Sequence, residues 1–291
     1  MKPEVFDPRT CHTGEGPIAI GSTNEDIYWV DIIGKKVLSR NLQTDEVSEF
    51  ATTEDVGFAI PRTSGGFILG TASGPIAQNA SGDREEFPTR KDADKKADAI
   101  PTRWNDAKVA PDGFLFLNTL TYELAPEAGA LYRVHPSDLK LERILSGTTI
   151  ANGMAWNESN DTFYFIDTIP GTIDAFDYRD GEISRRRTMW RASDKSQGLP
   201  DGMTIDSEGG LWVAFWSGGC IRRFDTHSNF RITEEIRFPV PHVTSCAFAG
   251  DNLQYLIATT AHQGDTENKQ SGMTFILEPG VKGTPTLTFD F

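Results

Sequence analysis

Residues 199–214 read Leu-Pro-Asp-Gly-Met-Thr-Ile-Asp-Ser-Glu-Gly-Gly-Leu-Trp-Val-Ala, and this stretch decides the fold class. A polar residue beside glycine comes first, a turn follows, and a run of large apolar residues typical of a buried strand ends the unit. Residues 152–167 repeat this order, from Asn-Gly-Met-Ala-Trp-Asn-Glu to Phe-Tyr-Phe-Ile-Asp. A polar side chain that recurs just before a buried strand is how a ring-shaped repeat protein directs side chains at its central axis.

Short β-rich runs bounded by turn residues recur six times along the chain, about 40 to 50 residues apart, which is the spacing of β-propeller blades. Amphipathic helical periodicity is nearly absent. We therefore predict an all-β fold, a six-bladed β-propeller with four-stranded blades. A pair of β-sandwiches would explain the strands but not the repeated order. The six runs are Asp26–Asp31, Gly66–Gly70, Gly113–Leu117, Thr162–Asp167, Gly210–Ala214 and Gln254–Ala258.

The two ends of the chain are both strand-like and predict how the ring closes. We expect Glu4–Phe6 and Thr286–Phe289 to share the last blade, which would hide sheet edges that otherwise invite aggregation. No domain boundary is evident, so residues 1–291 are predicted to form one propeller domain. Residues 81–103 are predicted to be an irregular insertion, either a lid over the mouth of the site or a solvated loop.

Composition excludes several classes of function. The formal net charge of −14 disfavours binding to nucleic acid, because an acidic surface repels phosphates. The three cysteines, Cys11, Cys220 and Cys246, form no CxxC pair, which argues against a zinc–thiolate site. Residues 1–7 lack the apolar run of a signal peptide, and no stretch approaches the roughly 18 apolar residues of a membrane span. We expect a cytoplasmic protein with free thiols and no membrane partner.

Three segments far apart in the chain each place an oxygen-bearing side chain next to glycine: Glu15, Asn152 and Asp201. If they converge on the axis, they form an oxygen-only site suited to a divalent cation. Read singly, Asn-Gly and Asp-Gly are ordinary turn dipeptides, and Glu15 could cap a turn. Because such residues recur at the start of related β units, binding of a cation is favoured over these local roles.

Other hydrolase designs find little support. The chain has no HExxH pair and no Gly-x-Ser-x-Gly elbow, which disfavours a zinc peptidase and a serine esterase. His12 and His262 could approach the axis, but lone histidines more often pack or lie at the surface. Among the tryptophans, Trp216 is the expected pocket wall, and Trp156 is expected in the core.

Taken together and in order, these motifs resemble the senescence-marker-protein/gluconolactonase/regucalcin family, whose members are six-bladed propeller lactone hydrolases with one divalent cation. The resemblance runs through nearly the whole chain. It is carried by Gly14–Pro17, Arg103–Gly113, Gly129–Tyr132, Ala151–Trp156, Leu199–Met203, Thr244–Phe248 and Gly280–Gly283.

The resemblance implies that Glu15, Asn152 and Asp201 are the protein ligands of the cation. It implies that Arg103 and Asn105 hold substrate oxygens, with Asn105 also close to the metal. A forked guanidinium suits a carbonyl, carboxylate or diol, and an amide offers both donor and acceptor to a polyol. Arg103 could instead pair with the neighbouring Asp106 or with a carboxylate of the insertion, and Asp106 and Lys108 are expected to serve local structure.

Two positions depart from the family pattern. Ala19 stands where the family often has Trp, which would leave room for a more apolar pocket. Some members bind sugar hydroxyls through a Glu a few residues before Gly-Ala-Leu-Tyr. That register holds Ala125 here, with Glu123 and Glu127 nearby but not aligned.

The leading hypothesis is a metal-dependent hydrolase that opens a sugar-derived lactone to its aldonic acid, with Asp201 as the general base. Calcium is the favoured cation, and zinc, manganese, magnesium or ferrous iron are alternatives. Two rival functions stay open. One is a calcium-dependent hydrolase of organophosphates or aryl esters, and the other is a non-catalytic calcium-binding propeller. The particular lactone, its ring size and the oligomeric state are left open.

Overall fold

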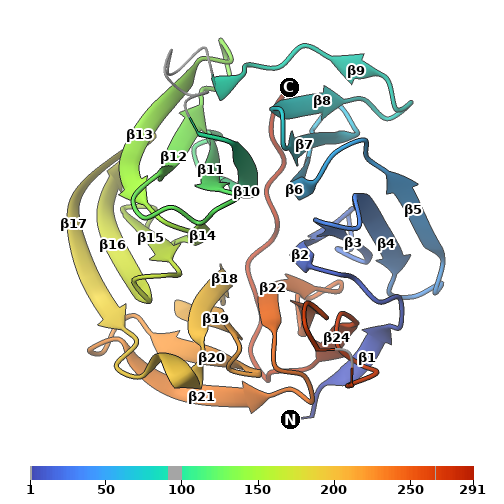
Figure 1. The fold of residues 1–291 in the computed structure, drawn as a ribbon, viewed down its shortest axis with the longest axis vertical. Helices are drawn as coiled ribbons and strands as arrows, with labels where there is room; N and C mark the ends of the chain where they lie inside the picture. Colours follow the sequence, from blue (N-terminus) through green and yellow to red (C-terminus); the bar gives the residue numbers. More distant parts are fainter. Residues whose placement is uncertain (1, 91–99, 266) are drawn as a thin grey trace.

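A computed structural model describes residues 2–90, 100–265 and 267–291. These residues form six four-stranded antiparallel sheets arranged in a ring around a central axis (Figure 1). The predicted all-β, six-bladed propeller is therefore confirmed. Each of the six β-rich runs recognised in the sequence contributes to the second strand of its blade.

The strands of each blade follow the chain from the axis outward, apart from the blade that holds both ends. The first three blades are β2 Gly14–Ile20, β3 Asp26–Asp31, β4 Lys36–Asn41 and β5 Val47–Ala51; β6 Val56–Pro61, β7 Phe67–Thr71, β8 Pro75–Gln78 and β9 Arg84–Glu85; and β10 Thr102–Val109, β11 Leu115–Thr121, β12 Gly129–Val134 and β13 Leu141–Thr148. The fourth and fifth are β14 Ala151–Trp156, β15 Thr162–Asp167, β16 Thr172–Arg179 and β17 Glu182–Arg191; and β18 Leu199–Ile205, β19 Gly210–Trp216, β20 Cys220–Asp225 and β21 Arg231–Arg237. The sixth combines β22 Val243–Ala249, β23 Tyr255–Thr260 and β24 Thr274–Leu277 with β1 Glu4–Asp7.

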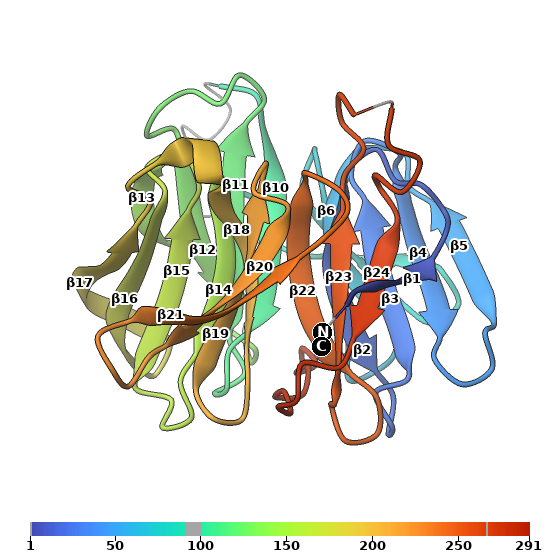
Figure 2. The same ribbon diagram turned by 90° about the horizontal axis from the view of Figure 1, so that it is seen from below.

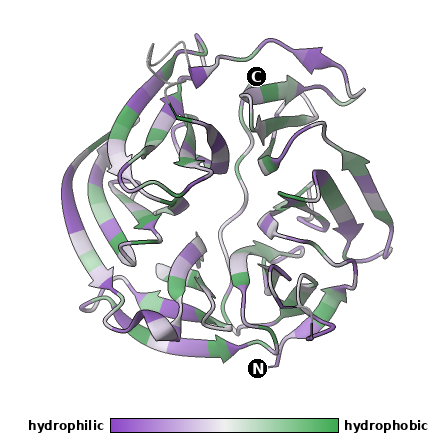
Figure 3. Ribbon diagram, in the orientation of Figure 1, coloured by the Kyte–Doolittle hydropathy of each residue, from purple (hydrophilic) through white to green (hydrophobic). Residues whose placement is uncertain are grey.

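The hydrophobic core lies between neighbouring blades. The aromatic second strands supply much of it: Trp29, Phe163 and Trp212 are fully buried. The outermost strands are mostly exposed, as in β17, and the hydrophilic colours of Figure 3 follow that strand. Seen edge-on, the ring has two open faces (Figure 2). We call the face that carries the short 3-10 helix η2 (Lys195–Gln197) the upper face, and the opposite one the lower face.

The ring closes through the sixth blade, where the N-terminal strand β1 pairs with β24, with Glu4 opposite Ile276. Closure by strands from both ends is thus confirmed, but the assignment of Thr286–Phe289 to this blade is wrong. β24 already occupies the place beside β1, so the chain beyond it is free to cross the middle of the ring on the lower face (Figure 1). There Phe289 is fully buried against the second and third blades, and its N–H donates to the carbonyl of Pro61 at 2.9 Å.

The segment 81–103, predicted as an insertion, contributes Arg84–Glu85 as the edge strand β9 and ends in the first residues of β10. Residues 91–99 lie outside the described part of the chain, so the lid hypothesis stays a prediction. Across the described ranges, no helix has the length and apolar character that crossing a bilayer requires.

Candidate metal centre

The innermost strands of all six blades break register at the same level. In β14 the pairing with β15 jumps from Ala151 to Met154, which leaves Asn152 inside a bulge, and in β18 it jumps from Pro200 to Met203 around Asp201. The corresponding breaks follow Glu15 in β2 and enclose Asn105 in β10. A bulge bends a strand and re-aims a side chain that regular pairing would direct elsewhere. Asn105, Asn152 and Asp201 therefore sit at equivalent places around the axis, and Glu15 lies one residue before the corresponding place in β2.

The glycines beside these residues allow the inner strands to approach each other. A Cβ atom on Gly153 would lie 2.7 Å from the backbone nitrogen of Met203, and one on Gly202 would lie 2.1 Å from the Ser245 hydroxyl oxygen. These dipeptides are consequently parts of inner strands and not turns. The sequence reading of Asn-Gly and Asp-Gly as turn dipeptides does not describe their role.

One cavity at the upper face, of about 500 Å³, brings the predicted site residues together. It is lined by Glu15, Arg103, Asn105, Asn152 and Asp201, which come from the inner strands of four different blades. Asn105, Asn152 and Asp201 are buried, whereas Glu15 and Arg103 keep partial exposure because they face the open space. The convergence expected from sequence is thus a feature of the fold.

A chain of hydrogen bonds orients the polar side chains of this cavity. Arg103 Nη1 donates to Asn105 Oδ1 at 2.8 Å, and Asn105 Nδ2 donates to Asn152 Oδ1 at 3.1 Å. Asn152 Nδ2 in turn donates to Thr168 Oγ1 at 2.9 Å, and the Thr168 hydroxyl donates to the Pro200 carbonyl at 2.8 Å. The Asn152 amide is therefore fixed with its oxygen on the side of Asn105, which leaves a defined acceptor next to the carboxylates.

The ionised forms of the two carboxyl groups in the cavity, Glu15 and Asp201, are destabilised by burial and by neighbouring negative charge. Burial, and then the negative charge of Asp106, raise the pKa of Glu15 to about 8, while the hydrogen bond from the Gly16 N–H and the charge of Arg103 oppose the shift. The pKa of Asp201 is raised well above its usual range by burial and then by Glu15 and Asp106. Like charges held together away from water favour a proton or a cation between them.

This donor set fits a divalent cation. Among the described residues, no group of three His, Cys, Asp or Glu side chains is placed to hold a metal ion. The predicted set of Glu15, Asn152 and Asp201 has two carboxylates and an amide, and such hard oxygen donors suit calcium, magnesium or manganese. The raised pKa values of the two carboxyl groups explain why a cation would bind here, because its positive charge would offset the repulsion between carboxylates that the fold holds close together.

Asp106 and Lys108 lie below this cavity, inside the channel. The carboxylate of Asp106 accepts a hydrogen bond from the N–H of Ala107 at 2.8 Å, and the backbone N–H of Asp106 donates to Asn118 Oδ1 at 3.1 Å. Burial raises the pKa of Asp106 to about 6, against the effect of Lys108. Asp106 therefore has the local contacts expected from sequence, and it also adds negative potential beneath the two carboxylates.

The rim of the cavity is apolar, a feature that no pattern in the sequence indicated. Four of its residues are large apolar or aromatic side chains at least 37% exposed: Ile33, Tyr122, Leu124 and Ile169. They belong to loops that join the second and third strands within three blades, where no periodicity marks them. Trp216 lines the same cavity, as expected, and stacks on His242 with ring centroids 4.3 Å apart.

The two departures from the family pattern have different consequences. Ala19 is buried in the core beside Trp29 and does not line the cavity, so the expectation that it enlarges the pocket is wrong. Around Ala125, the residues that reach the cavity are Tyr122 and Leu124. Neither Glu123 nor Glu127 lines it, so the structure offers no nearby substitute for the missing carboxylate at that place.

The structure also shows where Trp156 and the two histidines considered for the site, His12 and His262, lie. Trp156 is buried in the core, as expected, although its ring also borders a pocket on the lower face. His12 lines the upper cavity, and its ring packs edge-on against that of His262 with centroids 5.2 Å apart. His12 Nδ1 lies 2.9 Å from Thr13 Oγ1. His12 therefore reaches the mouth of the site, which the sequence analysis had left open, and it also has the packing contact that was the preferred expectation.

These observations define a class: a six-bladed β-propeller with carboxylate, amide and guanidinium groups gathered at one mouth of its central channel. Comparison with known proteins makes the class more specific. The family model described as SMP-30/gluconolactonase/LRE-like region matches residues 13–262. The chain belongs to this family, and membership supports sugar-lactone hydrolysis at the level of the family.

Individual relatives agree with this assignment over their full length. Regucalcin of Oryctolagus cuniculus is 34% identical over 305 residues, covering 99% of this chain and 98% of the relative. A luciferin-regenerating enzyme of known structure has a TM-score of 0.89 and 27% identity, covering 99% of this chain and 100% of that one. A protein of Agrobacterium tumefaciens described as a calcium-binding protein, regucalcin, also has a TM-score of 0.89, covering 100% of this chain and 98% of that one. Its identity of 22% bears on the fold alone.

Proposed function

We propose that this protein is a divalent-metal-dependent lactonase that opens a sugar-derived lactone to the aldonic acid. The observation that carries the proposal is the convergence of Glu15, Asn152 and Asp201 with Arg103 and Asn105 on one cavity. Glu15, Asn152 and Asp201 would hold the cation. Calcium is the favoured ion, because the donors are oxygen atoms and a protein of the same fold is described as calcium-binding.

The chain's own groups have separate tasks in this reaction. A cation held at this site would supply a Lewis acid that stabilises negative charge on the lactone carbonyl oxygen. Asp201 accepts the proton of the attacking water, and that proton then passes to the ring oxygen as its bond to the carbonyl carbon breaks. Arg103 and Asn105 donate to oxygens of the substrate, and their mutual hydrogen bond holds both in position beforehand.

The test is lactone hydrolysis measured by acid release, with spontaneous ring opening subtracted. Asp201→Ala and Asn152→Ala should each abolish turnover while the far-ultraviolet circular dichroism of the propeller is kept, and Glu127→Ala, an exposed carboxylate outside the cavity, should have full activity. Full activity in both site variants would refute the assignment. A protein that loses melting temperature with EDTA but never consumes lactone would be the non-catalytic calcium-binding propeller.

One observation favours a second substrate class at the same site. The exposed apolar rim, and Tyr122 and Leu124 where some family members carry a sugar-binding Glu, suit an aryl or alkyl group better than a polyol. The second candidate is therefore a calcium-dependent hydrolase of aryl esters or organophosphates. Gluconolactone, phenyl acetate and a phosphotriester assayed with one preparation separate the two. The class with the highest kcat/KM identifies the function, and Leu124→Asp should lower only the activity on apolar substrates.

A further inference from the structure

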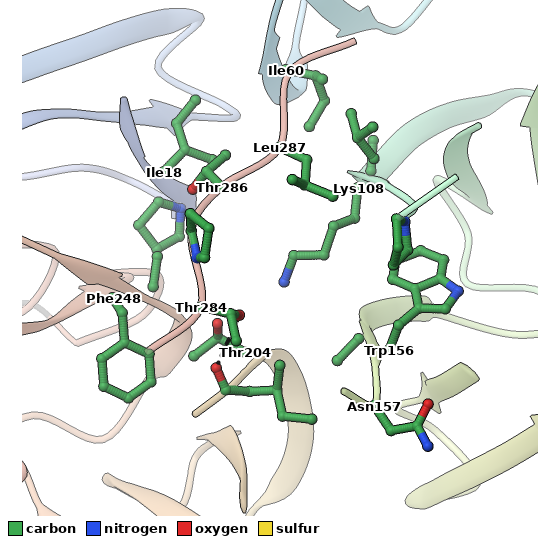
Figure 4. A pocket seen from close by; sticks show the side chains of 18 of the residues that line it. Ile18, Ile60, Lys108, Trp156, Asn157, Thr204, Phe248, Thr284, Thr286 and Leu287 are labelled. Atoms are coloured by element: carbon green, nitrogen blue, oxygen red, sulfur yellow. Dashed lines mark hydrogen bonds between the residues drawn. The ribbon is translucent and has the colours of Figure 1, made fainter. Parts of the chain in front are cut away.

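The lower face has a pocket of its own, which we call the lower pocket. It has a volume of about 250 Å³ and is closed on one side by the C-terminal segment 284–287 (Figure 4). Its walls come from the later residues of the inner strands, including Ile60, Trp156 and Phe248. No residue that lines it also lines the upper cavity. The lower pocket is therefore separate from the candidate metal centre.

A single cationic side chain enters this apolar space. Lys108, from β10, extends into the lower pocket, and its Nζ donates to the Met203 carbonyl at 3.1 Å (Figure 4). Among the described residues lining the pocket, Lys108 is the only one with a charged side chain. The side chain keeps partial exposure although it stands at the centre of the ring, because it faces the pocket. An ammonium group has three donors, so one carbonyl leaves capacity for a further acceptor.

The nearest opposite charge does not use that capacity. Asp106 acts on Lys108 electrostatically, and both residues border a narrower space of about 30 Å³ further up the channel, but the carboxylate of Asp106 accepts its hydrogen bond from the Ala107 N–H. Asn157, one of the polar residues that line the pocket, already donates through its Nδ2 to Asp161 at 2.8 Å and to Ser159 at 2.9 Å. Lys108 is thus the charged group that this pocket offers to a ligand, beside the neutral polar side chains of Asn160 and three threonines.

Size, lining and charge together define what would fit. The volume is below the roughly 300–1,000 Å³ typical of pockets for drug-sized ligands, which indicates a small occupant. The apolar walls favour hydrocarbon, since burying it removes apolar surface from water. A cation surrounded by such walls favours a carboxylate, because a charge-assisted hydrogen bond is strong where water is scarce. We propose that the lower pocket is a second ligand site that binds a small monocarboxylate with an apolar body, the carboxylate on Lys108 Nζ and the hydrocarbon against Ile60, Trp156 and Phe248.

The experiment is isothermal titration of the full chain with octanoate at pH 7.5, with octanol as the uncharged probe. The wild type should bind one octanoate saturably. Lys108→Met keeps the length of the side chain and removes its charge. It should weaken the binding of octanoate at least tenfold while leaving the binding of octanol unchanged. Leu124→Asp, on the rim of the upper cavity, is the matched control and should bind octanoate within twofold of wild type.

The proposal is overturned if the wild type shows no saturable binding, or if Lys108→Met binds octanoate as well as the wild type does. Loss of binding in Leu124→Asp would overturn it too, since the ligand would then occupy the upper cavity. A second variant covers the case in which Lys108→Met does not fold. Thr286→Trp fills the pocket from the C-terminal segment, outside the sheets, and should abolish octanoate binding while circular dichroism stays native. Unchanged binding in that variant also refutes the site.

Discussion

Replacing Glu15 by Gln should stabilise the metal-free protein and remove its response to calcium. The glutamine keeps an oxygen that can accept the hydrogen bond which the Gly16 N–H now donates to Glu15 Oε2 at 3.0 Å. It removes the carboxyl group, whose pKa is raised from 4.5 to about 8 by burial and then by the charge of Asp106. Because the folded state binds this proton more tightly than the unfolded state, the group stabilises the fold below pH 4.5. That contribution is lost as the pH rises to about 8.

The magnitude follows from the size of the shift. One pKa unit corresponds to ~1.4 kcal/mol. Between pH 4.5 and 8, the free energy of unfolding of the metal-free wild type should therefore fall by up to about 1.4 kcal/mol per pH unit relative to that of Glu15→Gln. This is an upper bound, since Glu15 is partly solvated through the cavity. At about 2 °C per kcal/mol for a chain of this length, the melting-temperature difference should grow by up to about 3 °C per pH unit.

The assay is thermal unfolding of both proteins in EDTA at pH 5, 6, 7 and 8, repeated with added calcium. Calcium at 100 times its dissociation constant should stabilise the wild type by about 2.7 kcal/mol, and Glu15→Gln should gain far less. The exposed Glu127→Gln is the matched control and should follow the wild type in both series. A melting-temperature difference that does not change with pH, or a less stable Glu15→Gln at pH 8 in EDTA, would refute the claim that the fold holds two repelling carboxylates.

Three further outcomes are expected. Arg103→Met should lower kcat/KM for the substrate roughly 10- to 100-fold, because a hydrogen bond from a charged donor contributes about 1.5–3 kcal/mol; an unchanged kcat/KM would remove Arg103 from the site. Phe289→Ala should lower the free energy of unfolding in urea by about 3–5 kcal/mol, since the phenyl side chain is fully buried where the C-terminal segment crosses the propeller. A loss below 1 kcal/mol would mean that this segment is not docked in solution. The buried thiols of Cys11, Cys220 and Cys246 should react with a thiol reagent at pH 8 only after denaturation, because burial raises the pKa of Cys11 and Cys246 to about 12; fast reaction of the native protein would contradict their placement.

The blades were predictable because their signal is local. A turn followed by an aromatic run, as in residues 207–214, defines a buried strand without reference to any other part of the chain. Repetition of that signal six times restricts the architecture to a ring. The ring in turn predicted that Glu15, Asn152 and Asp201 face the same axis, and all three line one cavity.

Other features depended on which residues become neighbours once the ring has closed. Thr286–Phe289 has the composition of a strand, and only the occupation of the last blade by β24 sends it across the lower face. Ala19 was expected to enlarge the pocket, but the face of β2 on which it lies points into the core. The apolar rim and the two separate pockets are likewise made by loops and strand ends from several blades.

The amino-acid sequence by itself determined the all-β class, the number of blades and the residues that face the axis, because alternation and turn chemistry act over a few neighbouring residues. Only the tertiary structure decided the route of the C-terminal segment, the apolar rim of the upper cavity and the position of Lys108 in the lower pocket. These features come from contacts between residues tens to hundreds of positions apart, and their energies depend on burial and charge that exist only when the ring is assembled.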